Sequence, residues 1–327
     1  MTDDFGYLNA RLRVRRSQLL PEGFFSEALV LSFPELVKVL GDTIYGPDLT
    51  GNGLPDVDRA VLVHLNRTTG DLPRLVSGEA REAVSLLLLR SDLANVKIIL
   101  RGQQAGWTTE EIMGHLGAGT LPRALYSLLV QAADAPSLAQ LLTMPRHPLA
   151  RALRHAVAAA REPLDLEIAL DREFYSAMLR RSQELDQPYL ASFLSFEIDA
   201  VNLATSLKLI TMGFVGPTDR FFLPGGRHVS QSLFERLAQG EVALLEELGN
   251  TDFGRVAEVQ DLAGLERGLR CLLLAKARDG VKDALGAGFA LAYILQKEWE
   301  AGRIRLLARR ALFGLPAAAV EAEVFCW

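Results

Sequence analysis

The sequence predicts an all-α protein made of three similar helical domains. Three observations predict this fold class: apolar residues recur with the period of a helix, strand-like alternation is scarce, and one helix pattern occurs three times. Only residues 28–33 and 59–66 contain short apolar runs that suit a strand, and both suit a buried helix equally well. We therefore expect helix packing to form the core.

The repeated pattern is clearest in residues 86–107, where apolar side chains form one stripe of a helix. The stripe consists of Leu86, Leu89, Leu93, Val96 and Leu100. About 107 residues later it recurs as Phe193, Phe196, Ala200, Leu203 and Leu207. About 208 residues later it recurs as Ile294, Lys297, Ala301, Ile304 and Ala308, with the lysine alone off the apolar pattern. Each copy therefore predicts a long helix with one buried face.

Polar residues recur beside the stripe in a fixed order. The acids are Asp92, Asp199 and Glu300; then come Asn95, Asn202 and, in the third copy, Arg303; the bases are Arg101, Lys208 and Arg309; the glycines are Gly106, Gly213 and Gly314. A base in the last turns suits the helix dipole, and a glycine can adopt the positive φ that ends a helix.

The repeated acid and base of one helix lie about 180° apart around its axis, so they cannot pair with each other. We interpret them as structural residues that cap or bridge to a neighbouring helix. The functional alternative is that the three helices line a common surface that receives a partner. In the third copy Arg303 replaces the asparagine, so the contacts of that polar face are expected to differ.

Turn and capping residues mark the other helices. Pro21 to Gly23 end the first helix, Ser32 offers an N-cap, Thr108 begins a capping box, and Pro163 and Pro188 interrupt the chain before long helices. The expected helices cover residues 7–20, 24–30, 35–40, 59–67, 86–107, 108–115, 123–131, 137–143, 149–160, 166–185, 188–213, 230–238, 242–248, 262–273 and 290–313.

Two further signals concern the division of the chain. The proline- and glycine-rich segment 216–226 is the best internal boundary, and the sequence NTDFG at 250–254 echoes GDTIYG at 41–46. We expect three repeat domains, at residues 1–115, 116–220 and 221–327.

The composition is that of an ordinary globular chain, with 327 residues, 49% of them hydrophobic. The net charge of −5 argues against general nucleic-acid binding, which needs a basic face. Two cysteines, Cys271 and Cys326, are too few and too unlike in setting to suggest a disulfide framework, so a reducing compartment is expected. The chain begins without a secretory signal pattern, and no run is apolar enough to span a membrane.

Motifs for chemistry are missing from the sequence. No histidine belongs to an HExxH motif, no serine sits in a nucleophile elbow, and Arg59 occupies the twelfth position of the calcium-loop-like segment that begins at Asp48. We predict no catalytic residue, no cofactor and no metal. An enzyme with dispersed catalytic residues is the alternative, and a buried cluster of acids and histidine in a deep pocket would favour it.

Several segments together resemble a known family. DLANVKIILRG, EIDAVNLATSLKL, EWEAGRIRLLARR, YLNARLRVRRSQLL, LDLEIALDREFYSAML and RFFLPGG are similar to the C subunits of prokaryotic V-type (A/V-type) ATPases and ATP synthases. The eukaryotic counterparts of these proteins are the d subunits of vacuolar ATPases. The resemblance extends over essentially the whole chain, with its segments in the same order.

The resemblance implies a non-catalytic subunit of the central rotor. It implies three helical domains about a pseudo-threefold axis that form a funnel, present in one copy per complex on the cytoplasmic face of the membrane. It implies that the protein is a socket between the central stalk and the membrane proteolipid ring, transmitting torque during ATP-linked proton or sodium transport. A free-standing helical scaffold of another system is the competing hypothesis.

Basic residues near both ends are candidates for contact with acidic partner surfaces, although ordinary solvated arginine is the simpler interpretation for most of them. They are Arg11, Arg13, Arg15, Arg16, Arg303, Arg305, Arg309 and Arg310.

Overall fold

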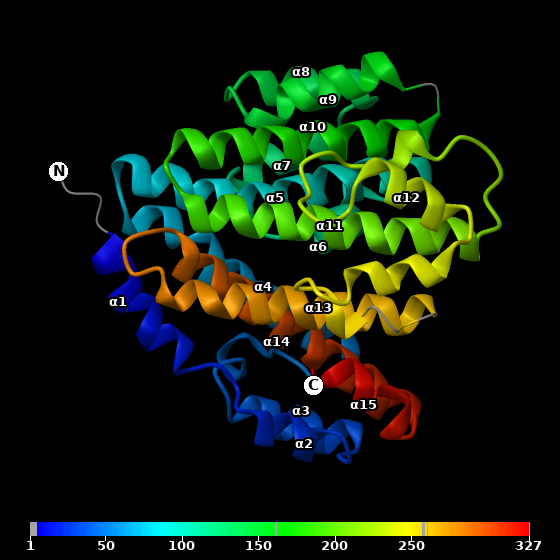
Figure 1. The fold of residues 1–327 in the computed structure, drawn as a ribbon. Helices are drawn as coiled ribbons and strands as arrows, with labels where there is room; N and C mark the ends of the chain where they lie inside the picture. Colours follow the sequence, from blue (N-terminus) through cyan, green and yellow to red (C-terminus); the bar gives the residue numbers. More distant parts are fainter. Residues whose placement is uncertain (1–4, 161, 257–258, 260, 327) are drawn as a thin grey trace. The chain divides into compact units, whose positions relative to one another are not determined.

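The computed structural model describes residues 5–160, 162–256, 259 and 261–326, and every regular element among them is a helix (Figure 1). The prediction of an all-α fold is confirmed. Both segments that suited a strand are helix or turn: residues 59–66 lie inside one long helix, and residues 28–33 join two short ones. No helix in these described ranges combines the length and the hydropathy that a bilayer crossing needs.

The chain forms two compact units. One, the terminal unit, combines residues 1–84 with residues 274–327, and the other, the middle unit, contains residues 85–273. The division into three repeat domains remains a prediction.

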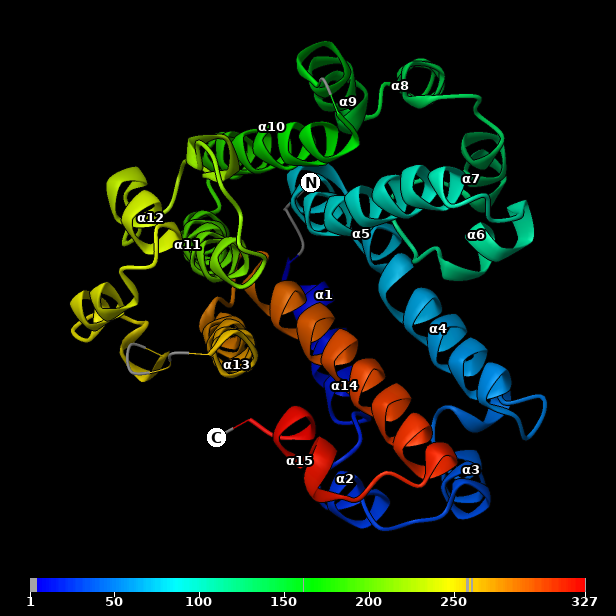
Figure 2. The same cartoon turned by 90° about the vertical axis from the view of Figure 1, so that its right-hand side faces the viewer.

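Helix α14 (Gly288–Phe313) is the centre of the terminal unit. It packs against α1 (Phe5–Arg16), α3 (Phe33–Gly41), α4 (Leu54–Gly70) and α15 (Ala318–Val324), and Figure 2 shows α4 running beside it. The apolar core contains side chains from both ends of the sequence, and the short helix α2 (Glu22–Ala28) contributes to it. The amino-terminal segments therefore fold onto a carboxy-terminal helix.

The middle unit contains the remaining long helices. These are α5 (Gly78–Gln104), α10 (Pro163–Glu184), α11 (Pro188–Thr211) and α13 (Leu262–Asp279), of which α5 and α13 extend across the unit boundary. Shorter helices accompany them: α6 (Thr109–His115), α7 (Arg123–Val130), α8 (Ala135–Thr143), α9 (Pro148–Ala159) and α12 (Gln231–Ala238). Prolines within the first turn begin α8, α9, α10 and α11, because proline suits that turn and lacks only an N–H that would remain unpaired there.

Local capping explains several helix starts. The Thr108 hydroxyl accepts from the Glu111 amide, the Glu111 carboxylate accepts in return, and the Ser230 hydroxyl accepts from the Leu233 amide. Residues 242–248, expected as an α-helix, form the 3₁₀ helix η4 (Val242–Leu248).

Candidate functional site

The first repeated acid, Asp92 on α5, is fully buried and holds the loop between α6 and α7. Its carboxylate accepts from the Thr120 amide at 3.0 Å, the Thr120 hydroxyl at 2.6 Å and the Tyr126 hydroxyl. His147 Nε2 lies 3.2 Å from the same carboxylate. Burial alone would raise the pKa of Asp92, but these hydrogen bonds outweigh it and the pKa lies below the ordinary carboxyl value.

The second repeated acid, Asp199 on α11, makes the same kind of contact with backbone groups alone. It accepts from the amides of Arg227, His228 and Val229 at 2.8 to 2.9 Å. A methyl group built on Gly226 would lie 1.9 Å from Asp199 Oδ1, so only glycine lets the loop approach this carboxylate.

Gly119 in the first copy meets the same constraint, because a methyl group there would lie 1.8 Å from Asp92 Oδ1. One helical turn beyond each acid, an asparagine fastens the start of the same loop. The amide of Asn95 both donates to and accepts from the backbone of Gly117, and Asn202 does so with Leu223, each bond being 2.8 Å long. The acid and the asparagine therefore form a clamp on a loop further along the chain, at residues 117–120 for α5 and at residues 223–229 for α11.

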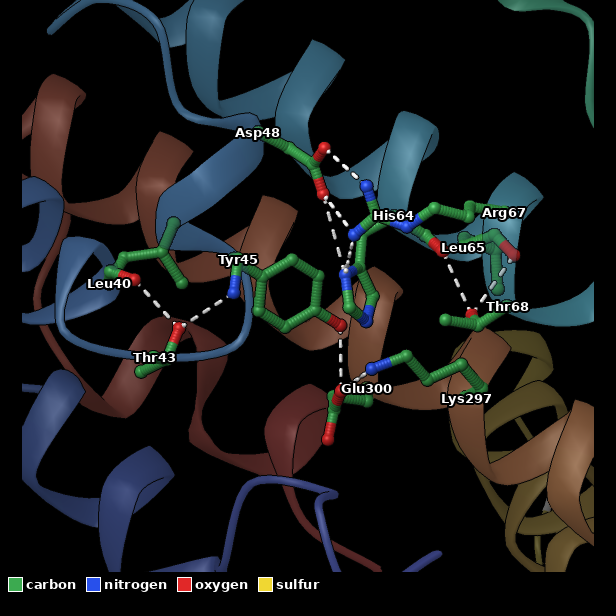
Figure 3. A network of polar contacts seen from close by, with 10 residues as sticks. All are labelled: Leu40, Thr43, Tyr45, Asp48, His64, Leu65, Arg67, Thr68, Lys297 and Glu300. Carbon is green, nitrogen blue, oxygen red and sulfur yellow. Dashed lines mark hydrogen bonds and ion pairs between the residues drawn. The ribbon is translucent and has the colours of Figure 1, made fainter. Parts of the chain in front are cut away.

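The third acid, Glu300 on α14, clamps a segment from the other end of the chain (Figure 3). Its carboxylate accepts from the Tyr45 hydroxyl at 2.6 Å and from Lys297 Nζ at 2.5 Å. The Leu20 amide donates to its other oxygen at 2.6 Å. At the asparagine position, the Arg303 guanidinium pairs with Glu22 at 2.7 Å. The clamp is thus retained with different side chains, on the loop that joins the first two helices.

A second polar cluster continues from this clamp (Figure 3). The His64 ring packs on the Tyr45 ring with centroids 4.6 Å apart, and His64 Nδ1 lies 3.2 Å from Arg67 and 3.5 Å from Asp48. Burial, with the nearby cations of Lys297 and Arg67, lowers the pKa of His64 to about 4. Burial also lowers the pKa of Lys297, which Glu300 partly offsets.

The echo between GDTIYG and NTDFG corresponds to one turn that occurs twice. In each, a threonine hydroxyl donates to a leucine carbonyl, from Thr43 to Leu40 and from Thr251 to Leu248, both at 2.7 Å. The threonine hydroxyl also accepts from the amide of the aromatic residue two positions later, Tyr45 in one turn and Phe253 in the other. The aromatic ring is then directed to a long helix: Tyr45 reaches Glu300, and Phe253 stacks on Phe196 with centroids 4.4 Å apart.

His147 is the counterpart of these aromatic residues in the remaining copy, although its loop has a different sequence. It lies five residues after buried Leu142, as Tyr45 follows Leu40 and Phe253 follows Leu248. Like Tyr45, it contacts the repeated acid of a long helix. Sequence reasoning missed this correspondence because the connecting segment, TMPRH, has Pro145 at the position of the threonine and contains no glycine.

Each repeated base pairs with an acid on a neighbouring helix. Arg101 of α5 pairs with Glu167 of α10, Lys208 of α11 with Glu266 of α13 at 2.7 Å, and Arg309 of α14 with Asp58 of α4 at 2.9 Å. Sequence reasoning did not identify these three acids. A signal was available, because each acid is the fifth residue of its helix and directly follows a buried or half-buried apolar residue.

The repeated glycines and the candidate arginines have clear positions. Gly106, Gly213 and Gly314 have φ of 71°, 61° and 64° and stand just beyond the three long helices. Six of the eight candidate arginines bind acids, an amide or a carbonyl group of the terminal unit: Arg15 binds Asp71, Arg16 binds Gln296, Arg303 binds Glu22, Arg305 and Arg309 bind Asp58, and Arg310 binds the Leu31 carbonyl. Arg11 and Arg13 contact only the aromatic residues Tyr7 and Phe289 among the described residues, and they remain exposed on α1.

The cluster of Asp92, Thr120 and His147 must be tested as a catalytic site, because His147 lines a cavity. In a serine-type triad the acid and the nucleophile bind opposite nitrogens of the imidazole. Here Asp92 and Thr120 both face Nε2, while Nδ1 accepts from the Leu149 amide. Because Nδ1 accepts a hydrogen bond, Nε2 carries the proton, and His147 cannot be the base that takes a proton from Thr120. Among the residues with a described placement, no group of three or more His, Cys, Asp or Glu is arranged to hold a metal ion.

Comparison with known proteins agrees with this structural interpretation. The family described as ATP synthase (C/AC39) subunit matches residues 8–323. The chain belongs to this family. It is 51% identical over 326 residues to the C subunit of the V-type ATP synthase of Thermus thermophilus, covering 100% of both chains. It is 32% identical to the protein of the same name from Deinococcus radiodurans, covering 99% of this chain and 92% of the relative.

More distant relatives belong to archaea. The C subunit of the A-type ATP synthase of Haloferax volcanii is 27% identical over 349 residues, covering 97% of this chain and 96% of the relative. As a member of the C/AC39 family, the chain is a structural, non-catalytic subunit of the rotary ATPase class. The repeated clamps and ion pairs are therefore parts of a scaffold.

Proposed function

We propose that this chain is the socket of a rotary ATPase or ATP synthase, which couples the central stalk to the membrane proteolipid ring and transmits torque between them. In this role it stands in one copy per complex, on the cytoplasmic face of the membrane, and ATP-linked proton or sodium transport depends on it. The relatives named as C subunits of V-type and A-type ATP synthases support the assembly to which it belongs.

The observation that carries the proposal is the cyclic order of the helix contacts. Tyr45 and Asp58 dock on α14, His147 and Glu167 dock on α5, and Phe253 and Glu266 dock on α11. Each of these pairs precedes the next long helix in the chain, so every segment docks on the long helix before it and the first docks on the last. Such an order is what a closed arrangement of three equivalent units requires.

Stiffness is the mechanical property that such a socket needs. In two of the three copies the buried carboxylate binds both loop amides and side chains, and in the other it binds loop amides alone. A loop that shifted would leave this carboxylate buried without its hydrogen-bond donors, which is unfavourable. Paired bases and acids then join each long helix to a neighbouring helix. These contacts would resist twisting better than flexible connections would.

Reconstitution tests the proposal. The purified chain should bind the isolated proteolipid ring in detergent and, separately, the purified stalk subunits, and it should bridge the two in a single complex. Binding to neither partner would contradict the proposal and would favour a free-standing scaffold.

Arg11 and Arg13 supply a sharper version of the test, because they are the exposed members of the candidate set. The double variant Arg11→Glu/Arg13→Glu should weaken binding to one of the two partners. The control is Lys38→Glu/Arg74→Glu, which reverses two other cations of the same unit. Equal binding by both double variants would show that Arg11 and Arg13 do not contact either partner.

A further inference from the structure

Helix α9 is an insertion that only one of the three copies carries. Helix α4 begins nine residues after Tyr45, and α13 begins nine residues after Phe253. Their counterpart α10 begins sixteen residues after His147. The seven extra residues, which equal about two turns of helix, allow α9 to form between α8 and α10, and it packs against both (Figure 1). The middle unit therefore has a surface there that the repeat does not require.

This surface is hollowed. A groove of about 550 Å³ is bounded by the turn between α8 and α9, by α9 itself and by α10. Buried apolar side chains line it, among them Leu86, Leu89, Phe174 and Met178. An open apolar groove of this kind is suited to contact with another molecule rather than to solvent.

Arginines surround the groove, and three of them lack an acid. Arg180 and Arg181 are paired with Glu184, and Glu173 faces His155 at 3.3 Å. Within the part of the chain that the structure describes, Arg146, Arg151 and Arg154 have no carboxylate partner, and the nearest polar contact is from Arg154 to the Thr143 hydroxyl at 3.5 Å. All three side chains belong to exposed residues. The rim therefore has excess positive charge over an apolar floor.

The geometry favours a protein segment over a small molecule. A small ligand site usually contains a few buried polar groups that fix the ligand. Here both nitrogens of His147 already bind Asp92 and the Leu149 amide, and the Thr143 hydroxyl donates to the Ala139 carbonyl. A protein segment with an apolar side chain and nearby carboxylates could pack on the apolar floor of the groove and pair with the arginines at its rim.

We propose that the groove between α9 and α10 binds an acidic segment of another protein of the assembly. An apolar side chain of that segment packs on Leu89 and Phe174, while neighbouring carboxylates pair with Arg146, Arg151 and Arg154. The inference rests on the proposed role within an assembly. It adds a contact that only one of the three internal repeats can make. A single such site gives a protein with a threefold sequence repeat one defined orientation toward an asymmetric partner.

Photo-crosslinking in the assembled complex tests the proposal. The residue p-benzoylphenylalanine replaces Ser176, which is exposed and lines the groove. Irradiation should join the chain to an acidic segment of another protein of the complex, with a yield that falls as NaCl is raised. The further change Arg146→Gln/Arg151→Gln/Arg154→Gln should lower that yield at least about fivefold, since the electrostatic contribution is removed.

The control triple variant Lys38→Gln/Arg81→Gln/Arg123→Gln removes three exposed cations elsewhere and should keep the yield. Unchanged circular dichroism of both triple variants shows that the fold is retained. A crosslink to lipid alone, a crosslink within the chain alone, or a yield that the groove arginines do not affect would overturn the proposal. If the wild-type chain still binds ring and stalk in those cases, the proposed function stands without the groove.

Discussion

The ammonium group of Lys297 lies 4.6 Å from the centre of the Tyr45 ring, at the position where Phe196 stacks on Phe253 in another copy. Lys297 is the residue that departs from the apolar stripe of the repeat. It is 1% exposed and pairs with Glu300. A cation and the Tyr45 ring therefore occupy the place that two phenyl rings occupy elsewhere.

Replacing Lys297 by methionine should destabilise the protein strongly. The variant leaves the Glu300 carboxylate buried without its cation, and removal of one partner of a buried pair costs about 3 to 5 kcal/mol. Urea unfolding followed by circular dichroism measures the loss. The double variant Lys297→Met/Glu300→Gln should recover part of it, because no unpaired charge remains. A loss below about 0.5 kcal/mol in the single variant would show that the pair is not buried in solution.

Gly226→Ala should lower stability by about 2 to 4 kcal/mol, because its methyl group would displace the loop from Asp199. Asp199→Asn should have a similar effect, since an amide group cannot accept from all three loop amides. The two changes break the same contact, so the double variant should lose clearly less than the sum. Gly302→Ala is the control: it lies in α14 with open space around it and should be neutral or stabilising. If the double variant lost the full sum of the two single losses, Gly226 and Asp199 would not act through one shared contact.

His64 should make the stability depend on pH between 6.5 and 4. Its pKa is about 4 in the folded protein and about 6.5 when unfolded, so the unfolded chain binds more protons in this window. The contribution is fully present above pH 6.5 and is lost as pH falls towards 4, by up to about 3 kcal/mol.

The charged groups that face His64 are Asp48, Arg67 and Lys297. His64→Phe should flatten the pH profile of unfolding relative to the wild type, measured by urea titration at each pH. His155→Gln, a change at an exposed residue, should keep the wild-type slope. Parallel profiles for wild type and His64→Phe would contradict the lowered pKa.

The ion pairs of the repeated bases should each contribute little, because their members are partly exposed. The Arg101 side chain is 65% exposed and that of Lys208 is 51% exposed. Double-mutant cycles on Arg101 with Glu167 and on Arg309 with Asp58 should give coupling energies of about 0.5 kcal/mol that decrease in high salt. Coupling above about 2 kcal/mol would indicate that these pairs are better shielded from water than their exposure suggests.

Substitution of the glycines that end the long helices should destabilise the protein through backbone conformation alone. Gly106, Gly213 and Gly314 have positive φ, yet nothing lies within 4 Å of a methyl group built on any of them. Alanine should therefore cost about 1 kcal/mol at each site through backbone strain. Thermal unfolding of the three single variants measures this cost, and a much larger loss at one site would point to an unseen contact.

Much of the fold could be predicted from the sequence because helical periodicity is a local signal. The stripe around Leu93, the prolines before long helices and the capping box at Thr108 all depend on residues close in the chain. The turns at 41–46 and 250–254 were also visible, because threonine, aromatic residue and glycine recur at fixed spacing. His147 escaped detection, since its loop has a different sequence and only its contact with Asp92 reveals the correspondence.

The amino-acid order alone reveals which residues are repeated and which kinds of helix they form, because period, charge and glycine position are local properties of the chain. What the repeated residues contact depends on the folded arrangement. The loop amides that bind Asp92 and Asp199 lie 28 or more residues away, and Glu300 binds the Leu20 amide at the opposite end of the chain. A buried carboxylate needs hydrogen-bond donors, and the folded structure decides which donors lie next to it. The spacing of residues along the chain does not identify those donors.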